Sequence, residues 1–190
     1  MSHFTKRYHP PGTAPGTLVA SDSAVPLSIR LITYTDTHYA ERTFSDLIDS
    51  VPLLDAEATT WIDVRGNIQP DVLQQLGQWL NLHDLALEDV LNTGQQAKLE
   101  DYDEQLFVVM HRPSLDASGA LQLDQVSVFL APGVLVSFYG QAQDLFGPVC
   151  ERLRDHRGRL RRHGSDYLLY RLLDLIVDHG FPILEHYGKR

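Results

Sequence analysis

The chain has 190 residues, of which 43% are hydrophobic and 22% are charged, and its formal net charge is −9. This balance is typical of a folded globular protein and excludes a globally disordered chain. The negative charge also argues against a general nucleic-acid binder, because such proteins derive affinity from an excess of Lys and Arg facing phosphates, so cations are the more natural partners.

The first part of the chain indicates a loose start followed by α/β alternation. Residues 1–26 are rich in Pro, Gly and Ser, which is typical of an extended or loose segment. The segments after it alternate like strands or show helical spacing, and Pro70 suits the first turn of a helix. The expected elements are a strand at 27–35, a helix at 43–51, a strand at 59–66 and a helix at 70–82.

The centre of the chain starts with a short helical segment and then becomes rich in strands. Residues 82–94 read LHDLALEDVLNTG, in which Leu87, Val90 and Leu91 form one apolar helical face. Hairpin-length connections join the strands that follow, so part of the sheet is expected to be antiparallel and the whole sheet mixed. These strands are expected at 98–103, 105–112, 121–131 and 133–140.

The last part of the chain is expected to be helical from Asp144 onward. Residues 144–164 form a basic segment, and residues 165–190 form a helix whose first half is apolar on nearly every side. Such a helix needs cover beyond its own domain, from a further helix or another subunit. Gly180 and Pro182 are expected to end or kink it. Its narrow polar stripe consists of Arg171, Asp174 and Asp178.

Acidic side chains gather in the 82–94 helix and just after it. Asp84 and Glu88 lie four residues apart on one face, a like-charge pair that costs about 0.2–0.5 kcal/mol. The helix N-terminus can offset the charge of Asp84, or a cation can bind between this surface and another. Carboxylates without Cys or His suit Mg²⁺ or Ca²⁺, although a solvated strand edge is the alternative. The wider acidic set is Glu88, Asp89, Glu100, Asp101, Asp103 and Glu104.

Other candidate sites are weak. The chain has no Gly-rich phosphate loop, no nucleophile elbow and no His pair at metal-binding helical spacing, which disfavours an enzyme. The single cysteine, Cys150, excludes an internal disulfide and a multi-cysteine zinc site, and is interpreted as a small packed side chain. A run of arginines either faces anionic headgroups or nucleic acid, or pairs with the protein's own carboxylates. The run comprises Arg152, Arg154, Arg157, Arg159, Arg161 and Arg162.

No segment of the sequence predicts export or a membrane span. The N-terminus lacks the apolar region of a signal peptide, and no run approaches the ~18 uncharged apolar residues that a spanning helix requires. The chain as given is therefore expected to be soluble and unsecreted.

Four stretches are specific when their order and spacing are taken together. They are PGTLV (15–19), HDLALEDVLN (83–92), LDQVSVFLAPGVLVSF (123–138) and PVCERLRDHRGRLRRHGSDYLLYRLLDLIVD (148–178). These stretches resemble the cytoplasmic N-terminal domain of the CorA family of magnesium and cobalt channels. The resemblance implies an α/β fold, a three-layer α/β/α sandwich with a mixed, partly antiparallel sheet, followed by the start of a long helix.

The resemblance also implies a domain organisation. Residues 1–26 are a loose N-terminal segment, residues 27–164 are the α/β cytoplasmic domain, and residues 165–190 start a long helix leading toward a stalk and membrane region. The Gly-Met-Asn signature and the membrane helices of the family are not in this sequence. The full-length protein is expected to be a homopentamer at the cytoplasmic face of the inner membrane, which this chain reaches only through those missing helices.

The family further suggests where cations bind. Divalent cations, Mg²⁺ or Co²⁺, are expected between neighbouring domains, held by acids at the positions of Glu88, Asp89 and Asp174, with a partner carboxylate on the stalk beyond residue 190. The hypothesis is a soluble cation-sensing gating domain that is not an enzyme and has no catalytic or cofactor-binding residues. Three alternatives stay open: a zinc-transporting sibling, a metal-dependent hydrolase and a stand-alone binding module.

Overall fold

One mixed β-sheet forms the centre of the computed structural model, which describes residues 14, 16–19, 24–46, 55, 57–156 and 158–189. Its strand order is β2-β1-β3-β7-β6-β5-β4. β3 and β7 pair in parallel, and the other neighbours pair antiparallel. The strands of these described residues are β1 (Ser28–Tyr34), β2 (Tyr39–Phe44), β3 (Thr59–Arg65), β4 (Lys98–Tyr102), β5 (Gln105–Leu115), β6 (Leu121–Ala131) and β7 (Val134–Tyr139).

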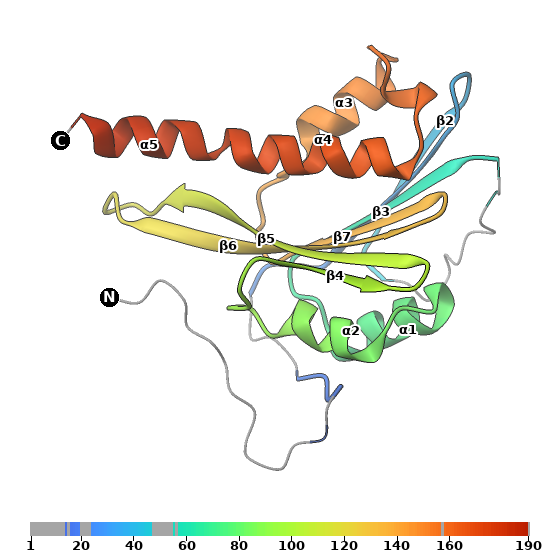
Figure 1. Cartoon of the computed structure of the whole chain (residues 1–190), viewed down its shortest axis with the longest axis horizontal. Coiled ribbons are helices and arrows are strands. Elements are labelled where there is room, and N and C mark those ends of the chain that lie inside the picture. The colour runs from blue at the N-terminus through green and yellow to red at the C-terminus, as the bar shows by residue number, and fades with distance from the viewer. Residues whose placement is uncertain are drawn as a thin grey trace.

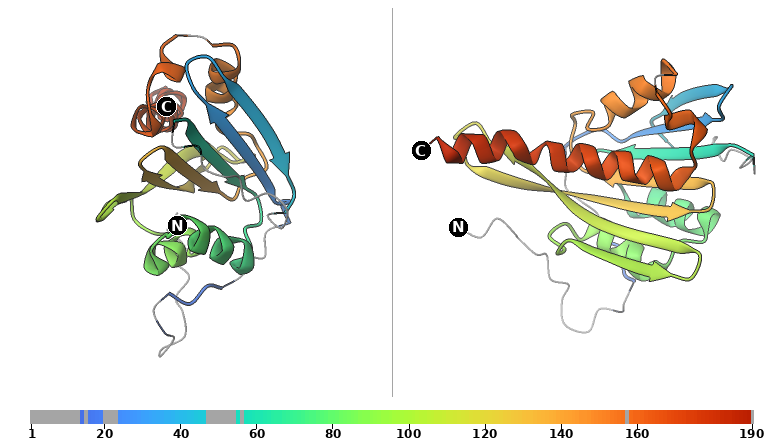
Figure 2. Two further views of the ribbon diagram at one scale, coloured as in Figure 1. Left: turned by 90° about the vertical axis from the view of Figure 1, so that its right-hand side faces the viewer. Right: turned by 45° about the horizontal axis from the view of Figure 1, so that its top comes forward.

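Helices cover both faces of this sheet. α1 (Pro70–Leu80) and α2 (Asp84–Leu91) lie on one face, while α3 (Gly147–Arg154) and α4 (Ser165–Asp178) lie on the other (Figure 1). The end-on view in Figure 2 shows the sheet between the two helical layers. The predicted three-layer α/β/α sandwich with a partly antiparallel sheet is therefore confirmed.

The sheet separates two hydrophobic cores because successive strand side chains point to opposite faces. In β3, Trp61 packs with the residues of α3 and α4, whereas Ile62 and Val64 pack with those of α1 and α2. β3 is buried on both faces, since helices cover both. The exposed residues of α1 and α2 therefore lie on the opposite side of the sheet from those of α3 and α4.

The helix predicted at 70–82 is confirmed as α1, and local signals define both of its ends. Pro70 occupies the first turn, where its missing N–H costs no hydrogen bond. Asn81 ends the helix in the left-handed conformation, with φ of 52°, and its N–H donates to Gly77 O.

Two helical predictions are corrected by the structure. The helix expected at 43–51 is wrong at its start, because Thr43 and Phe44 belong to β2; residues 47–51 lie outside the described part of the chain. The basic helix expected at 144–164 is shorter, since α3 is followed by left-handed residues at His156 and Gly158 and by a 3₁₀ turn at Leu160–Arg162.

The C-terminal helix is long and interrupted once. α4 ends at Asp178, and α5 (Gly180–Gly188) continues its line beside the ends of β5 and β6 (Figure 1). Pro182 falls in the first turn of α5, where a missing N–H is tolerated, so the break precedes it. Apolar side chains remain exposed along this helix, and their cover by a further helix or subunit stays a prediction. They are Tyr170, Val177, Phe181, Leu184 and Tyr187.

Within the described residues, no helix combines the length and the apolar composition that a membrane crossing requires. Most of the segment 1–26 lies outside the described residues, but Gly16 and Leu18 lie against α1 and α2. The predicted division between residues 27–164 and 165–190 remains a prediction.

Candidate cation-binding site

The α2 helix carries Glu88 and Asp89 and is anchored by its opposite face. Leu87, Val90 and Leu91 are buried against the sheet, as predicted, together with Ala86. His83 caps the helix by accepting the Leu85 N–H at 3.3 Å. α2 begins at Asp84, so the partial positive charge of the helix N-terminus stabilises that carboxylate. The helix N-terminus therefore accounts for the acidic residue at position 84 without a bound cation.

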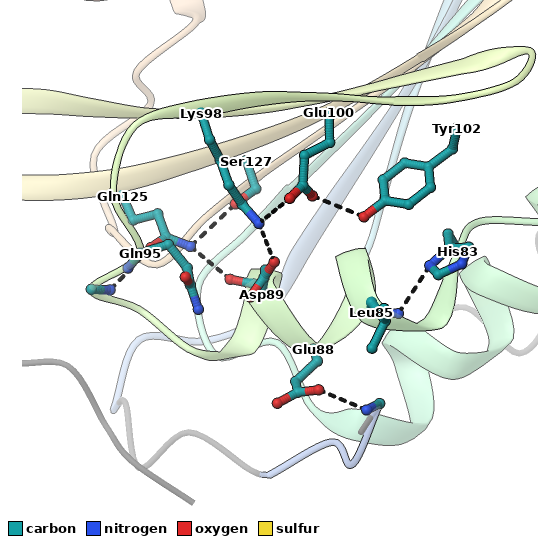
Figure 3. Close-up of polar contacts among 12 residues, drawn as sticks. His83, Leu85, Glu88, Asp89, Gln95, Lys98, Glu100, Tyr102, Gln125 and Ser127 are labelled. Atoms are coloured by element: carbon teal, nitrogen blue, oxygen red, sulfur yellow. Dashed lines mark hydrogen bonds and ion pairs between the residues drawn. The ribbon is translucent and has the colours of Figure 1, made fainter. Parts of the chain in front are cut away.

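Glu88 is hydrogen-bonded to the N-terminal segment (Figure 3). The Gly16 backbone N–H donates to Glu88 Oε2 at 2.6 Å. Gly16 adopts a φ of +82°, which favours glycine, and a Cβ there would lie 3.4 Å from the Asp84 Cβ. Leu18 packs against the core beneath α1 and α2. The segment around Gly16 thus holds one oxygen of Glu88.

Asp89 is paired with a cation supplied by the protein itself. Lys98 Nζ, on β4, lies 2.6 Å from Asp89 Oδ2 and 2.8 Å from Glu100 Oε1 (Figure 3). Tyr102 donates its hydroxyl to Glu100 Oε2 at 2.8 Å. The hydrogen bond from Lys98 lowers the pKa of Glu100, which keeps that carboxyl ionised. A cation that binds Asp89 Oδ2 must therefore displace the Lys98 ammonium.

A glutamine fixes the C-terminal end of α2 to the sheet. Gln125 on β6 donates to the Asp89 carbonyl oxygen at 2.8 Å and accepts the Gly94 and Gln95 N–H groups at 3.0 and 3.1 Å. Gln125 therefore fixes the backbone at Asp89 and the turn that follows α2 to the sheet. Neither Gln125 nor Lys98 was singled out from the sequence.

Asp174, the third predicted ligand, lies on α4 in the other helical layer. Its Oδ2 accepts a hydrogen bond from Arg171 Nη1 at 2.9 Å. The sheet stands between α4 and α2, as Figures 1 and 2 show. The structure therefore brings Glu88 and Asp89 together but does not bring Asp174 to them within one chain.

The donor chemistry fits a hard divalent ion, but one chain supplies too few donors. In the part of the chain that the structure describes, no three His, Cys, Asp or Glu side chains are placed to hold one metal. Mg²⁺ prefers carboxylate oxygens and keeps several waters, so a site completed by a second chain is compatible with this geometry. The assignment of Glu88, Asp89 and Asp174 as ligands stays a prediction.

The remaining predicted acids lie at the exposed end of the β4–β5 hairpin. Asp101, Asp103 and Glu104 line a shallow hollow with Asp84 and His83. β4 is the last strand of the sheet. Charged side chains there protect an open strand edge from pairing with other chains, which was the alternative interpretation of this set.

Cys150 belongs to a buried polar network rather than to a reactive site. Its Sγ lies 2.7 Å from Arg30 Nη1, and Arg30 also pairs with Asp144. Burial raises the pKa of the Cys150 thiol to about 12. On neighbouring strands, Asp63 is 1% exposed and accepts the Ser137 hydroxyl at 2.6 Å. Burial raises the pKa of Asp63 to about 6.

The geometry defines an α/β/α domain with carboxylates on two layers, and comparisons with known proteins identify its family. Residues 56–190 match the model of the CorA-like Mg²⁺ transporter protein family. The chain therefore belongs to the CorA family, which confirms the resemblance. It is a family of transport proteins and not of enzymes.

Individual relatives agree with this membership. The chain is 35% identical over 176 residues to a protein described as cobalt/magnesium transport protein CorA of Thermotoga maritima, covering 92% of this chain and 50% of that protein. The chain thus spans half or less of the length of the curated relatives that it matches.

Solved structures share the fold. The soluble domain of CorA from Methanocaldococcus jannaschii matches with a TM-score of 0.65 at 14% identity, over 89% of this chain and 62% of that one. Full-length CmaX matches with a TM-score of 0.67 at 16% identity, over 89% of this chain and 51% of that one. At these identities the likeness concerns the fold alone.

Proposed function

We propose that this chain is the cation-sensing gating domain of a Mg²⁺ and Co²⁺ transport channel, acting on the cytoplasmic side of the inner membrane. Family membership and the relative described as a cobalt/magnesium transport protein support a role in divalent-cation transport. The observation that carries the sensing role is the placement of the acids. Glu88 and Asp89 stand on α2 in one helical layer, and Asp174 stands on α4 in the other.

Acids on opposite layers suit a cation that bridges two copies of the chain. If α2 of one copy faces α4 of the next, each contact joins two different surfaces, and such contacts form a ring when the rotation between copies closes. In the full-length channel we expect five copies. A cation that binds only the closed ring stabilises it by RT ln(1 + [L]/Kd), and several such sites acting together make the response steep. Without the cation, the facing carboxylates repel each other.

The internal partners of these acids set a low affinity. A cation must compete with Lys98 for Asp89, with the Gly16 N–H for Glu88 and with Arg171 for Asp174. Weak binding suits an abundant ion such as Mg²⁺. The donors are all carboxylates, whereas zinc sites are usually built from Cys and His, so the magnesium and cobalt branch is favoured over a zinc-transporting sibling.

A complementation experiment on the 190-residue chain tests this proposal. Sedimentation at high protein concentration is expected to show weak association that millimolar Mg²⁺ or Co²⁺ strengthens. Both Glu88→Gln/Asp89→Asn and Asp174→Asn should abolish the cation effect. An equimolar mixture of the two variants should regain part of it, because one copy keeps its α2 acids and the other keeps Asp174.

A matched control is Asp101→Asn/Asp103→Asn, which removes two exposed carboxylates that are not among the three proposed ligands. This variant should respond to cations as the wild type does. A cation response that survives in both site variants, or a mixture that gains nothing over the separate variants, would contradict the bridging role of these acids.

A further inference from the structure

The arginine run is a basic surface on an acidic protein, and its members have different partners. Arg154 pairs with Glu41 on β2 at 2.6 Å, and Arg162 lies 3.4 Å from Asp36. Arg161 donates to the backbone carbonyl groups of the last two residues of α3, and its guanidinium stands 5.0 Å from the centre of the Tyr39 ring. For these three arginines, pairing within the protein is a sufficient explanation.

Arg152 and Arg159 differ from the other arginines of this surface. Both are exposed, and in the part of the chain that the structure describes neither is paired with a carboxylate. Both line one hollow of about 630 Å³ together with Arg171 and Tyr167. Arg152 comes from α3, Arg159 from the turn after it and Arg171 from α4. Three separate segments thus each contribute an arginine to the lining of one hollow.

The charges around this hollow favour an anion. Glu151 and Asp155 also line it, so the three arginines leave one net positive charge in a chain whose net charge is −9. A guanidinium presents a planar fork of donors that matches phosphate oxygens. The Tyr167 ring, 4.5 Å from His163 and 5.6 Å from Tyr170, adds an aromatic wall.

We propose that the hollow between α3 and α4 binds a phosphate group, with Arg152 and Arg159 as its main donors. Arg171 is the third donor, and it already donates to Asp174 at 2.9 Å. A phosphate group in the hollow therefore competes with Asp174 for Arg171. The link between phosphate binding and cation binding at Asp174 rests on the proposed function, because Asp174 is a candidate cation ligand. The binding of phosphate in the hollow does not rest on the proposed function.

The test is a calorimetric titration of the 190-residue chain with inorganic pyrophosphate at low salt and without divalent cations. Saturable binding in the millimolar range or tighter is expected, weakening as salt is added. Arg152→Ala/Arg159→Ala should bind at least tenfold more weakly. The control Arg42→Ala removes an exposed arginine on β2, outside the hollow, and should bind like the wild type. Circular dichroism verifies that each variant is folded.

A parallel experiment distinguishes the source of the phosphate group. Co-sedimentation uses vesicles of phosphatidylcholine with or without phosphatidylglycerol. Binding only to the phosphatidylglycerol vesicles, lost in the double variant, assigns the site to a lipid headgroup, whereas binding of pyrophosphate in solution assigns it to a free anion. The proposal is overturned if neither probe binds, or if the double variant binds as tightly as Arg42→Ala.

The competition between phosphate and Asp174 for Arg171 can be measured separately. Asp174→Asn leaves Arg171 free, so pyrophosphate should bind this variant severalfold more tightly than the wild type. An unchanged affinity would refute the competition for Arg171, and it would do so independently of any measurement of cation binding.

Discussion

Gly77 and Leu87 form the contact that sets the distance between α1 and α2. Gly77 is buried in α1, and a Cβ added to it would lie 2.4 Å from Leu87 Cδ1, a distance at which atoms overlap. Leu87 is 3% exposed and has little room to move. Gly77→Ala gains about 1 kcal/mol of helix propensity, but overpacking costs about 1–3 kcal/mol. A net destabilisation of about 1 kcal/mol is expected from the two effects.

The sign of this effect should reverse when Leu87 is shortened. Leu87→Ala alone should cost about 2–5 kcal/mol. In that background the added methyl group meets no Leu87 Cδ1, so Gly77→Ala should stabilise the protein by about 1 kcal/mol. Urea unfolding of the four proteins, compared at equal m-values, measures the cycle. If Gly77→Ala has the same sign in both backgrounds, the contact does not determine how α1 and α2 pack.

Three further predictions concern single side chains. The pKa of Asp63, about 6 in the folded protein against 3.8 ordinarily, means that its protonated form stabilises the fold and that this contribution is lost as pH rises. The unfolding free energy of the wild type minus that of Asp63→Asn should therefore fall by about 2 kcal/mol between pH 4 and 6, and a flat difference would contradict the burial argument. Cys150, buried beside Arg30 with a raised thiol pKa, should react with a thiol reagent only as fast as the protein unfolds; rapid labelling of the native chain would show an open path to it. Lys98→Met should strengthen Mg²⁺ binding severalfold in calorimetry by freeing Asp89 and Glu100, whereas Lys189→Met should not, and equal affinities would remove Lys98 as a competitor.

Sequence patterns predicted elements whose signals are local. Pro70 and the apolar spacing of α1 are contained within one segment, as is the apolar face of α2, and both helices were placed within a few residues. β2 was missed because its YAERTF sequence lacks a regular apolar alternation and becomes a strand by pairing with β1, with Thr43 opposite Arg30. Pairing of this kind depends on the fold and leaves no periodic signal in the strand itself.

Of the candidate site, only the acidic residues could be predicted from the sequence. Family resemblance pointed to Glu88, Asp89 and Asp174, but their partners come from distant parts of the fold. Gly16 and Glu88 are 72 residues apart, and Lys98 reaches Asp89 from a strand across a turn. The charge repulsion inferred on α2 assumed unpartnered carboxylates, and such contacts become visible only when the strands and helices are assembled.

The sheet also separates the chain's two tryptophans. Trp61 is fully buried on the α3 and α4 side, where its ring lies 5.8 Å from Phe146 and its Nε1 donates to Ser137. Trp79 packs at the edge of the other core, on α1 beside α2. Replacing either with phenylalanine leaves a single tryptophan, whose emission can be excited at wavelengths that the tyrosines do not absorb. Emission from Trp79 then reports on the layer that carries Glu88 and Asp89, and emission from Trp61 on the layer that carries Asp174, so each half of the proposed contact has its own optical signal.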